Sequence, residues 1–232
     1  MKKVAFTLAE VLITLGIIGV IAALTIPTLI NKYNQHVFNT QFKKAYSTIS
    51  NAHAAARNEW GTVPVCYYNR DSLTREAVTT DCNDFSSLFL EQFKIGTECG
   101  LNAMANGCIP KYKGAEQVKQ ENNPHMSEED INNAMVGCTN VSTSALRRYP
   151  AFILNDGTII MPAAGSNTER ISVNLIVDIN GKKAPNKWGY DIFYFYTYFN
   201  NGKFSLETDG GCMPIEKGGR STEQMLKYAT SH

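Results

Sequence analysis

Residues 11–30 read VLITLGIIGVIAALTIPTLI, an almost entirely apolar run near the N-terminus. Residues 11–31 contain no charged side chain, and a helix of that length covers roughly 30 Å, the thickness of the hydrocarbon core of a bilayer. A helix buried in a soluble protein would normally carry a polar stripe, and this one has none. The stretch therefore predicts a membrane-spanning helix near the N-terminus.

A cleaved secretory signal peptide is the alternative, with Lys2 and Lys3 as its basic start. The apolar run is longer than the usual core of a signal peptide, and its end at residues 28–31 has no small-residue cleavage site. An uncleaved anchor is therefore favoured. The two lysines predict that the N-terminus lies in the cytoplasm and that the rest of the chain is exported.

Glu10 lies at the edge of the apolar run, where a carboxylate entering lipid is costly unless it is paired. As part of a plain anchor, it would be an interfacial residue that reaches the headgroups. The residues around it read Lys2-Lys3-Val4-Ala5 and then Phe6-Thr7-Leu8-Ala9-Glu10-Val11.

This segment resembles the N-terminus of the type IV pilin and type II secretion pseudopilin family. In that family a prepilin peptidase removes a short basic leader directly before a Phe, and a Glu is the fifth residue of the mature chain. The resemblance implies a cut between Ala5 and Phe6, methylation of Phe6 and an assembly role for Glu10. Gly19 and Pro27 fall where pilin helices typically carry a Gly and a Pro, so they join the assembly residues. The main departure is Ala5, since the family mostly has Gly before the cut.

The same resemblance implies a function in filament assembly. The chain would be a pilin-like or pseudopilin subunit, neither an enzyme nor a cofactor protein, inserted once in the inner membrane with its head in the periplasm or at the cell surface. Its partners would be the prepilin peptidase, other pilin or pseudopilin subunits, an inner-membrane assembly platform and the lipid bilayer, with no nucleic acid. The alternative is a signal-anchored exported domain, enzymatic or binding, that never polymerises.

Physical chemistry agrees with an assembly role for two of these residues. A cut before Phe6 creates an α-amino group, and pairing this amine with Glu10 of a neighbouring subunit neutralises two charges inside an apolar helix bundle. Pro27 lacks an N–H and weakens the helix around Ala23, which gives a place to bend on leaving the lipid. A simple kink near the membrane exit is the other interpretation of Pro27.

The helix is expected to continue beyond the membrane as an amphipathic stalk. Apolar residues recur at steps of three or four along one face: Phe38, Phe42, Ala45, Ile49, Ala52, Ala56 and Trp60. Gly61 and Pro64 then predict the end of the helix. The predicted organisation is a leader (residues 1–5), a transmembrane or filament-core helix (6–31), an amphipathic helix (32–61) and an exported globular head (62–232).

The head contains all six cysteines, none of them in a C-x-x-C pair. An even count in an exported domain predicts disulfides rather than a zinc or redox site, although some buried free thiols are the alternative. Of the fifteen possible pairings, the short loops favour two, and the remaining cysteines then form a longer link: Cys66–Cys82, Cys99–Cys108 and Cys138–Cys212.

Strand signals concentrate after Tyr149 and predict a small antiparallel sheet, so that the fold class is α+β. Residues 151–154 and 158–161 flank Asn155-Asp156-Gly157 and predict a hairpin, followed by strands at 171–179, 193–199 and 203–206. In the fourth run, Phe193, Phe195 and Phe199 share one face while Tyr194, Tyr196 and Tyr198 share the other. The tyrosine row is expected to be a half-covered sheet face rather than a sugar- or partner-binding surface.

Two polar segments of the head need an interpretation. Residues 178–191 begin Asp178-x-Asn180-Gly181 and end in Asp191, a fragment that resembles a calcium loop, and some pseudopilins hold calcium in this region. The fuller series of oxygen ligands is absent, so a plain turn with Asx hydrogen bonds is favoured and no metal is expected. Residues 111–135 are polar and predict an exposed loop with a short helix starting at Ser127.

Charge and motifs limit the remaining functions. The chain has 22 Lys and Arg against 21 Asp and Glu, and this balance argues against a nucleic-acid binder. No nucleophile elbow, P-loop, HExxH or dinucleotide fingerprint occurs in the sequence, which lowers the expectation of an enzyme.

Overall fold

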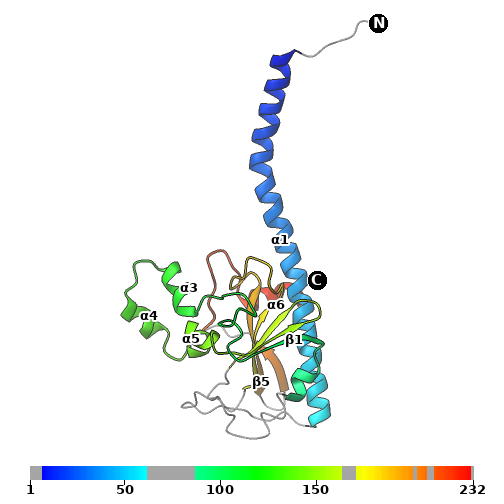
Figure 1. Cartoon of the computed structure of the whole chain (residues 1–232), viewed down its shortest axis with the longest axis vertical. Helices are drawn as coiled ribbons and strands as arrows, with labels where there is room; N and C mark the ends of the chain where they lie inside the picture. Colours follow the sequence, from blue (N-terminus) through cyan, green and yellow to red (C-terminus); the bar gives the residue numbers. More distant parts are fainter. Residues whose placement is uncertain (1–6, 62–86, 164–170, 201–202, 208–211, 231–232) are drawn as a thin grey trace.

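The computed structural model describes residues 7–61, 87–163, 171–200, 203–207 and 212–230. One long N-terminal helix, α1 (Leu8–Trp60), extends far beyond the head, and its C-terminal half lies along one side of a β-sheet (Figure 1). The fold is α+β, as the sequence predicted.

Helix α1 has 53 residues, which corresponds to a length of about 80 Å. The apolar stripe predicted for its second half is the face that packs on the head: Phe42, Ala45, Ile49, Ala52 and Ala56 are buried, and Phe38 and Trp60 are partly buried. The helix ends at Trp60 because Gly61 adopts a left-handed conformation (φ 86°) and donates its N–H to Arg57 O. The predicted end of the helix is confirmed.

The sheet is a six-stranded antiparallel meander in which chain order equals spatial order. Its strands are β1 (Ile95–Gly100), β2 (Ala151–Leu154), β3 (Ile159–Pro162), β4 (Ile171–Asp178), β5 (Ile192–Asn200) and β6 (Lys203–Glu207). The five strands expected after Tyr149 are all present, including the hairpin whose turn places Gly157 at φ 89°. Strand β1 was not predicted; it pairs with β2 at the edge of the sheet.

The two faces of the sheet pack against different layers. Val177 of β4 pairs with Phe193 of β5, and these side chains join the core shared with α1. The next pair, Ile176 and Tyr194, points the other way into a second core. Tyr194 is buried and Tyr196 is half-buried, so the tyrosine row is a covered sheet face where it is described; the side chains of Tyr198 and Phe199 lie outside the described residues.

The second layer consists of short helices between β1 and β2: α3 (Ala115–Asn122), α4 (Glu128–Ala134), the 3₁₀ turn η1 (Thr139–Val141) and α5 (Thr143–Leu146). The expectation of an exposed loop over residues 111–135 was therefore wrong in part. Ala115 and Val118 are buried on the inner side of α3, and this contact stabilises a helix in a polar sequence. The short helix starting after Ser127 is present as α4, and the Ser127 hydroxyl accepts from Asp130 N.

The last described element is helix α6 (Thr222–Thr230), which packs beside α1. Met225 and Ala229, one turn apart, are buried in the core that α1 shares with the sheet. The buried half of α1 is therefore held by both the sheet and a second helix.

Candidate functional site

The N-terminal half of α1 is the largest uncovered apolar surface in the described part of the chain. Its large aliphatic side chains are all exposed, Leu8 to 79% and Leu24 to 72%. By length and composition, this helix is long and apolar enough to cross a membrane. The exposed set is Leu8, Val11, Leu12, Ile13, Leu15, Ile17, Ile18, Val20, Ile21, Leu24, Ile26, Leu29 and Ile30. Water is a poor solvent for such a surface, so lipid or other apolar helices must cover it.

Glu10 closes the first turn of this helix together with Thr7. The Thr7 hydroxyl accepts from Glu10 N at 3.3 Å, while the Glu10 carboxylate accepts from Thr7 N at 2.8 Å and from the Thr7 hydroxyl at 2.9 Å. This reciprocal pair is a capping box, which satisfies amide groups that the first turn would otherwise leave without partners. The carboxylate itself stays exposed beside the helix N-terminus, where a negative charge is favoured.

The other residues of the N-terminal motif lie in or just before the same helix. Gly19 has open space where a side chain would be, so an approaching helix can come close to the backbone there. Pro27 lies inside α1, which continues through it to Trp60. Ala5 and Phe6, the expected processing residues, lie outside the described residues.

Polar contacts join the C-terminal half of α1 to the head at two further points. Lys44 Nζ lies 2.7 Å from Asp156 Oδ2 in the β2–β3 turn. Closer to the N-terminus of the helix, buried Asn39 accepts a 3.2 Å hydrogen bond from Arg220, which lies just before α6. These contacts add to the apolar packing that holds the C-terminal half of α1 on the head.

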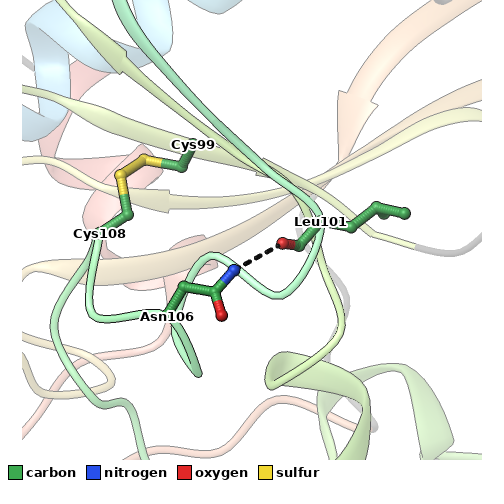
Figure 2. The surroundings of a disulfide bond; sticks show 4 residues. All are labelled: Cys99, Leu101, Asn106 and Cys108. Atoms are coloured by element: carbon green, nitrogen blue, oxygen red, sulfur yellow. Dashed lines mark hydrogen bonds between the residues drawn. A yellow bond between two sulfur atoms is a disulfide. The ribbon is translucent and has the colours of Figure 1, made fainter.

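Two of the three expected disulfides are present. Cys99–Cys108 closes a tight loop after β1, in which the Asn106 amide donates to Leu101 O, as Figure 2 shows. Cys138–Cys212 joins the helical layer to the segment before α6 across 74 positions. The expected pair Cys66–Cys82 lies outside the described residues. Disulfides of this kind persist in an oxidising compartment.

The loop between β4 and β5, residues 178–191, brings two buried carboxylates together. Asp178 Oδ1 accepts from the backbone N–H groups of Asn180 (3.2 Å) and Gly181 (2.8 Å), and its Oδ2 accepts from the Tyr112 hydroxyl (2.9 Å). Asp191 accepts from the N–H groups of Asn186 (2.8 Å) and Lys187 (2.6 Å). These are the Asx-type hydrogen bonds that the sequence favoured.

Burial dominates the electrostatics of the pair. It raises the pKa of Asp178 to about 8, with a further contribution from the charge of Asp191. The pKa of Asp191 rises to about 6, again because burial disfavours the charged form. Tyr112, buried against Asp178, has its pKa raised by the same desolvation and by the nearby carboxylate.

The residues of this loop do not fit a calcium ion. Every carboxylate oxygen of Asp178 and Asp191 already accepts a hydrogen bond from the protein. Calcium requires six to eight oxygen ligands, and in the described residues no group of three or more His, Cys, Asp or Glu side chains is placed to hold a metal. Asn180 Oδ1 is buried without a donor, but a single neutral oxygen does not make a calcium site. Asp178, Asn180 and Asp191 therefore form a hydrogen-bonded turn.

Comparisons with protein-family models, with curated proteins and with solved structures each found no match.

Three residues of these sites were not singled out from the sequence. Thr7 could have been found, because Thr7-x-x-Glu10 before an apolar run is a capping-box signature. Asn186 lies within the loop but carried no recognised motif. Tyr112 is 66 positions from Asp178, and no local pattern predicts their contact.

Proposed function

We propose that this chain is a pilin-like or pseudopilin subunit, cut before Phe6, methylated there, and assembled through residues 6–31 into a type IV pilus or a type II secretion pseudopilus. The observation that carries the proposal is the division of α1 into two halves. One half is apolar and uncovered, and the other is packed on a disulfide-bonded head. A continuous helix of this kind places many heads around a core of apolar helices.

The N-terminal motif supports assembly over a simple anchor. An anchor needs only the apolar run, whereas this chain adds a carboxylate at the first turn and a Phe where the cut would fall. After cleavage, Thr7 would be the second residue of the chain, so the new amine would lie next to the capping box of Thr7 and Glu10. An acid and an amine that enter an apolar bundle together can neutralise each other between subunits.

The head supports an exported location. Its disulfides require an oxidising compartment to persist, and the basic Lys2 and Lys3 favour retention of the N-terminus on the cytoplasmic side. The subunit would then be a single-pass inner-membrane precursor whose head faces the periplasm before assembly.

The experiment that tests assembly substitutes Glu10 by Ala in the full chain. We expect normal membrane insertion and normal cleavage but little filament in shear fractions, because an unpaired buried charge costs about 3–5 kcal/mol. Glu10→Gln is the size-matched control and should fail in the same way, since it lacks the charge.

Thr7→Ala separates the charge from the cap. It removes the capping hydroxyl, worth about 1 kcal/mol, and keeps the Glu10 carboxylate. If charge pairing drives assembly, Thr7→Ala should assemble far better than Glu10→Ala. Normal filament yield from Glu10→Ala would contradict the proposal and favour an anchored domain that does not polymerise.

A further inference from the structure

The side-chain amide of Asn186 lies among three oxygen atoms of the β4–β5 loop. With its NH₂ group facing them, the orientation that these acceptors require, Nδ2 donates to Gly181 O at 3.0 Å and to Lys183 O and Asp178 Oδ2 at 3.2 Å. The Asn186 backbone N–H donates to Asp191 Oδ2. One residue thus joins both buried aspartates and two carbonyl groups of the loop.

The loop backbone is shaped to hold this amide. Asn186 has φ 52°, a left-handed conformation that Asn adopts more readily than most residues. Gly181 also has a positive φ of 68°, and an added Cβ there would clash with Gly157 O of the β2–β3 turn. The acceptor Gly181 O is therefore carried on a segment packed against the β2–β3 turn.

A carboxylate oxygen and two carbonyl oxygens converging on one point are the ligand types that a hard cation such as calcium takes. Here a neutral donor group lies at that point at hydrogen-bond distances. The remaining oxygens of Asp178 and Asp191 accept from backbone N–H groups.

We propose that the Asn186 amide does in this loop what a bound cation would otherwise do, so that the head folds and keeps its loop closed without a metal ion. The inference is independent of filament assembly, because it concerns only the β4–β5 loop and its contacts with Tyr112 and the sheet.

If the proposal is right, replacing the side-chain nitrogen of Asn186 by an oxygen should make the stability of the head depend on a metal ion. Asn186→Asp keeps the size of the side chain and tolerates the left-handed backbone. It replaces the donor with a third carboxyl group facing Asp178 and two carbonyl groups, an arrangement that a bound cation stabilises and that without one must take up a proton or stay unfavourable. Asn186→Gly is the matched control, since Gly keeps the backbone conformation and removes the amide without adding charge.

The experiment is thermal unfolding of the full chain in detergent, with excess EDTA or with millimolar calcium chloride. The wild-type melting temperature should be the same in both buffers. Asn186→Asp should melt about 3–8 °C lower in EDTA, as expected for loss of a buried hydrogen-bonded group, and calcium should recover most of that loss. The melting temperature of Asn186→Gly should be lowered by the same amount in both buffers. Asn133→Asp changes an exposed residue of α4, and its melting temperature should match that of the wild type.

Two results would overturn the proposal. A wild-type chain that loses stability in EDTA and regains it with calcium, with stoichiometric binding by titration calorimetry, would make Asn186 a ligand through its oxygen. An Asn186→Asp chain that is as stable as the wild type in EDTA, or that calcium fails to restore, would show that the amide does not occupy a cation-like position.

Discussion

Phe42 of α1 meets Phe193 of β5 edge to face, with ring centroids 4.8 Å apart at an interplanar angle of 76°. Both rings are fully buried, and the ring centroid of Phe195 lies 5.7 Å from that of Phe42. This contact joins the helix to the sheet at the level where α1 changes from exposed to covered. Edge-to-face pairs add to the free energy of burial, so Phe42 anchors the helix on the head.

We predict that the two halves of α1 respond differently to the same kind of substitution. Phe42→Ala should destabilise the head by about 3–5 kcal/mol, because it leaves a cavity against Phe193 and Phe195. Leu12→Ala should leave the melting temperature of the head unchanged, because Leu12 is 62% exposed and contacts no part of it. Thermal unfolding of the full chain in detergent measures both; equal effects would contradict the division of the helix.

The two described disulfides should contribute unequally to stability. In the chain-entropy account, a link across 74 positions constrains the unfolded chain more than a link across 9. We expect Cys138→Ser/Cys212→Ser to cost about 4–5 kcal/mol and Cys99→Ser/Cys108→Ser about 3 kcal/mol. Denaturant unfolding of the two double variants tests this order, and a larger loss for the short loop would contradict it.

The sequence predicted the parts of the fold that have a strong local period. The stripe of α1, its end at Gly61 and the alternation of Phe193 and Tyr194 are all properties of a few consecutive turns or residues. Strand β1 was not predicted, because Ile95–Gly100 contains two glycines and is mostly exposed. It forms a strand by pairing with β2. Helix α6 carried a readable signal: Ser221 and Gln224 form a capping pair just before Met225.

In the candidate sites too, residues with a local sequence motif could be predicted and long-range contacts could not. Glu10 and Asp178 could be singled out because their immediate neighbours form recognisable motifs. The surroundings of Asp178 could not be predicted, because Tyr112 comes from the segment before α3 and the contacts of the Asn186 amide depend on the conformation of the whole loop. Burial and long-range contact, rather than local sequence, decide whether such a loop holds a metal or a hydrogen bond.

The Asp178 carboxyl should make stability fall as the pH rises. Its pKa is raised from 3.8 to about 8, so the folded chain binds the proton more tightly than the unfolded chain, and that stabilisation is lost as the pH rises through about 8. Asp191, whose pKa is about 6, contributes in the same direction at lower pH. Buried His53 acts in the opposite direction below about pH 6.5, because desolvation lowers its pKa to about 4. Tyr112, the other titratable group facing Asp178, stays protonated throughout, since its pKa is raised.

The effect of Asp178 on stability can be measured separately in the pH range above the titration of His53 and up to the raised pKa of Asp178. From about pH 6.5 to about pH 8 the wild-type chain should lose about 1–2 kcal/mol of stability. Asp178→Asn should show a flat profile over the same range, whatever its absolute stability. Thermal unfolding across the pH series provides the measurement, and a wild-type stability that rises with pH in this window would contradict a raised pKa of the buried Asp178.

Filament assembly as proposed depends on the cut before Phe6, because without it neither the new amine nor its pairing with Glu10 exists. Ala5 departs from the glycine of the resembled family, and Ala5→Gly should leave the cut site unchanged and speed processing. Mass spectrometry of the N-terminal peptide, from native membranes of cells that possess a prepilin peptidase, tests the cut directly. We expect a chain that begins at methylated Phe6; an intact Met1 start, or a cut elsewhere in the apolar run, would contradict the proposed assembly.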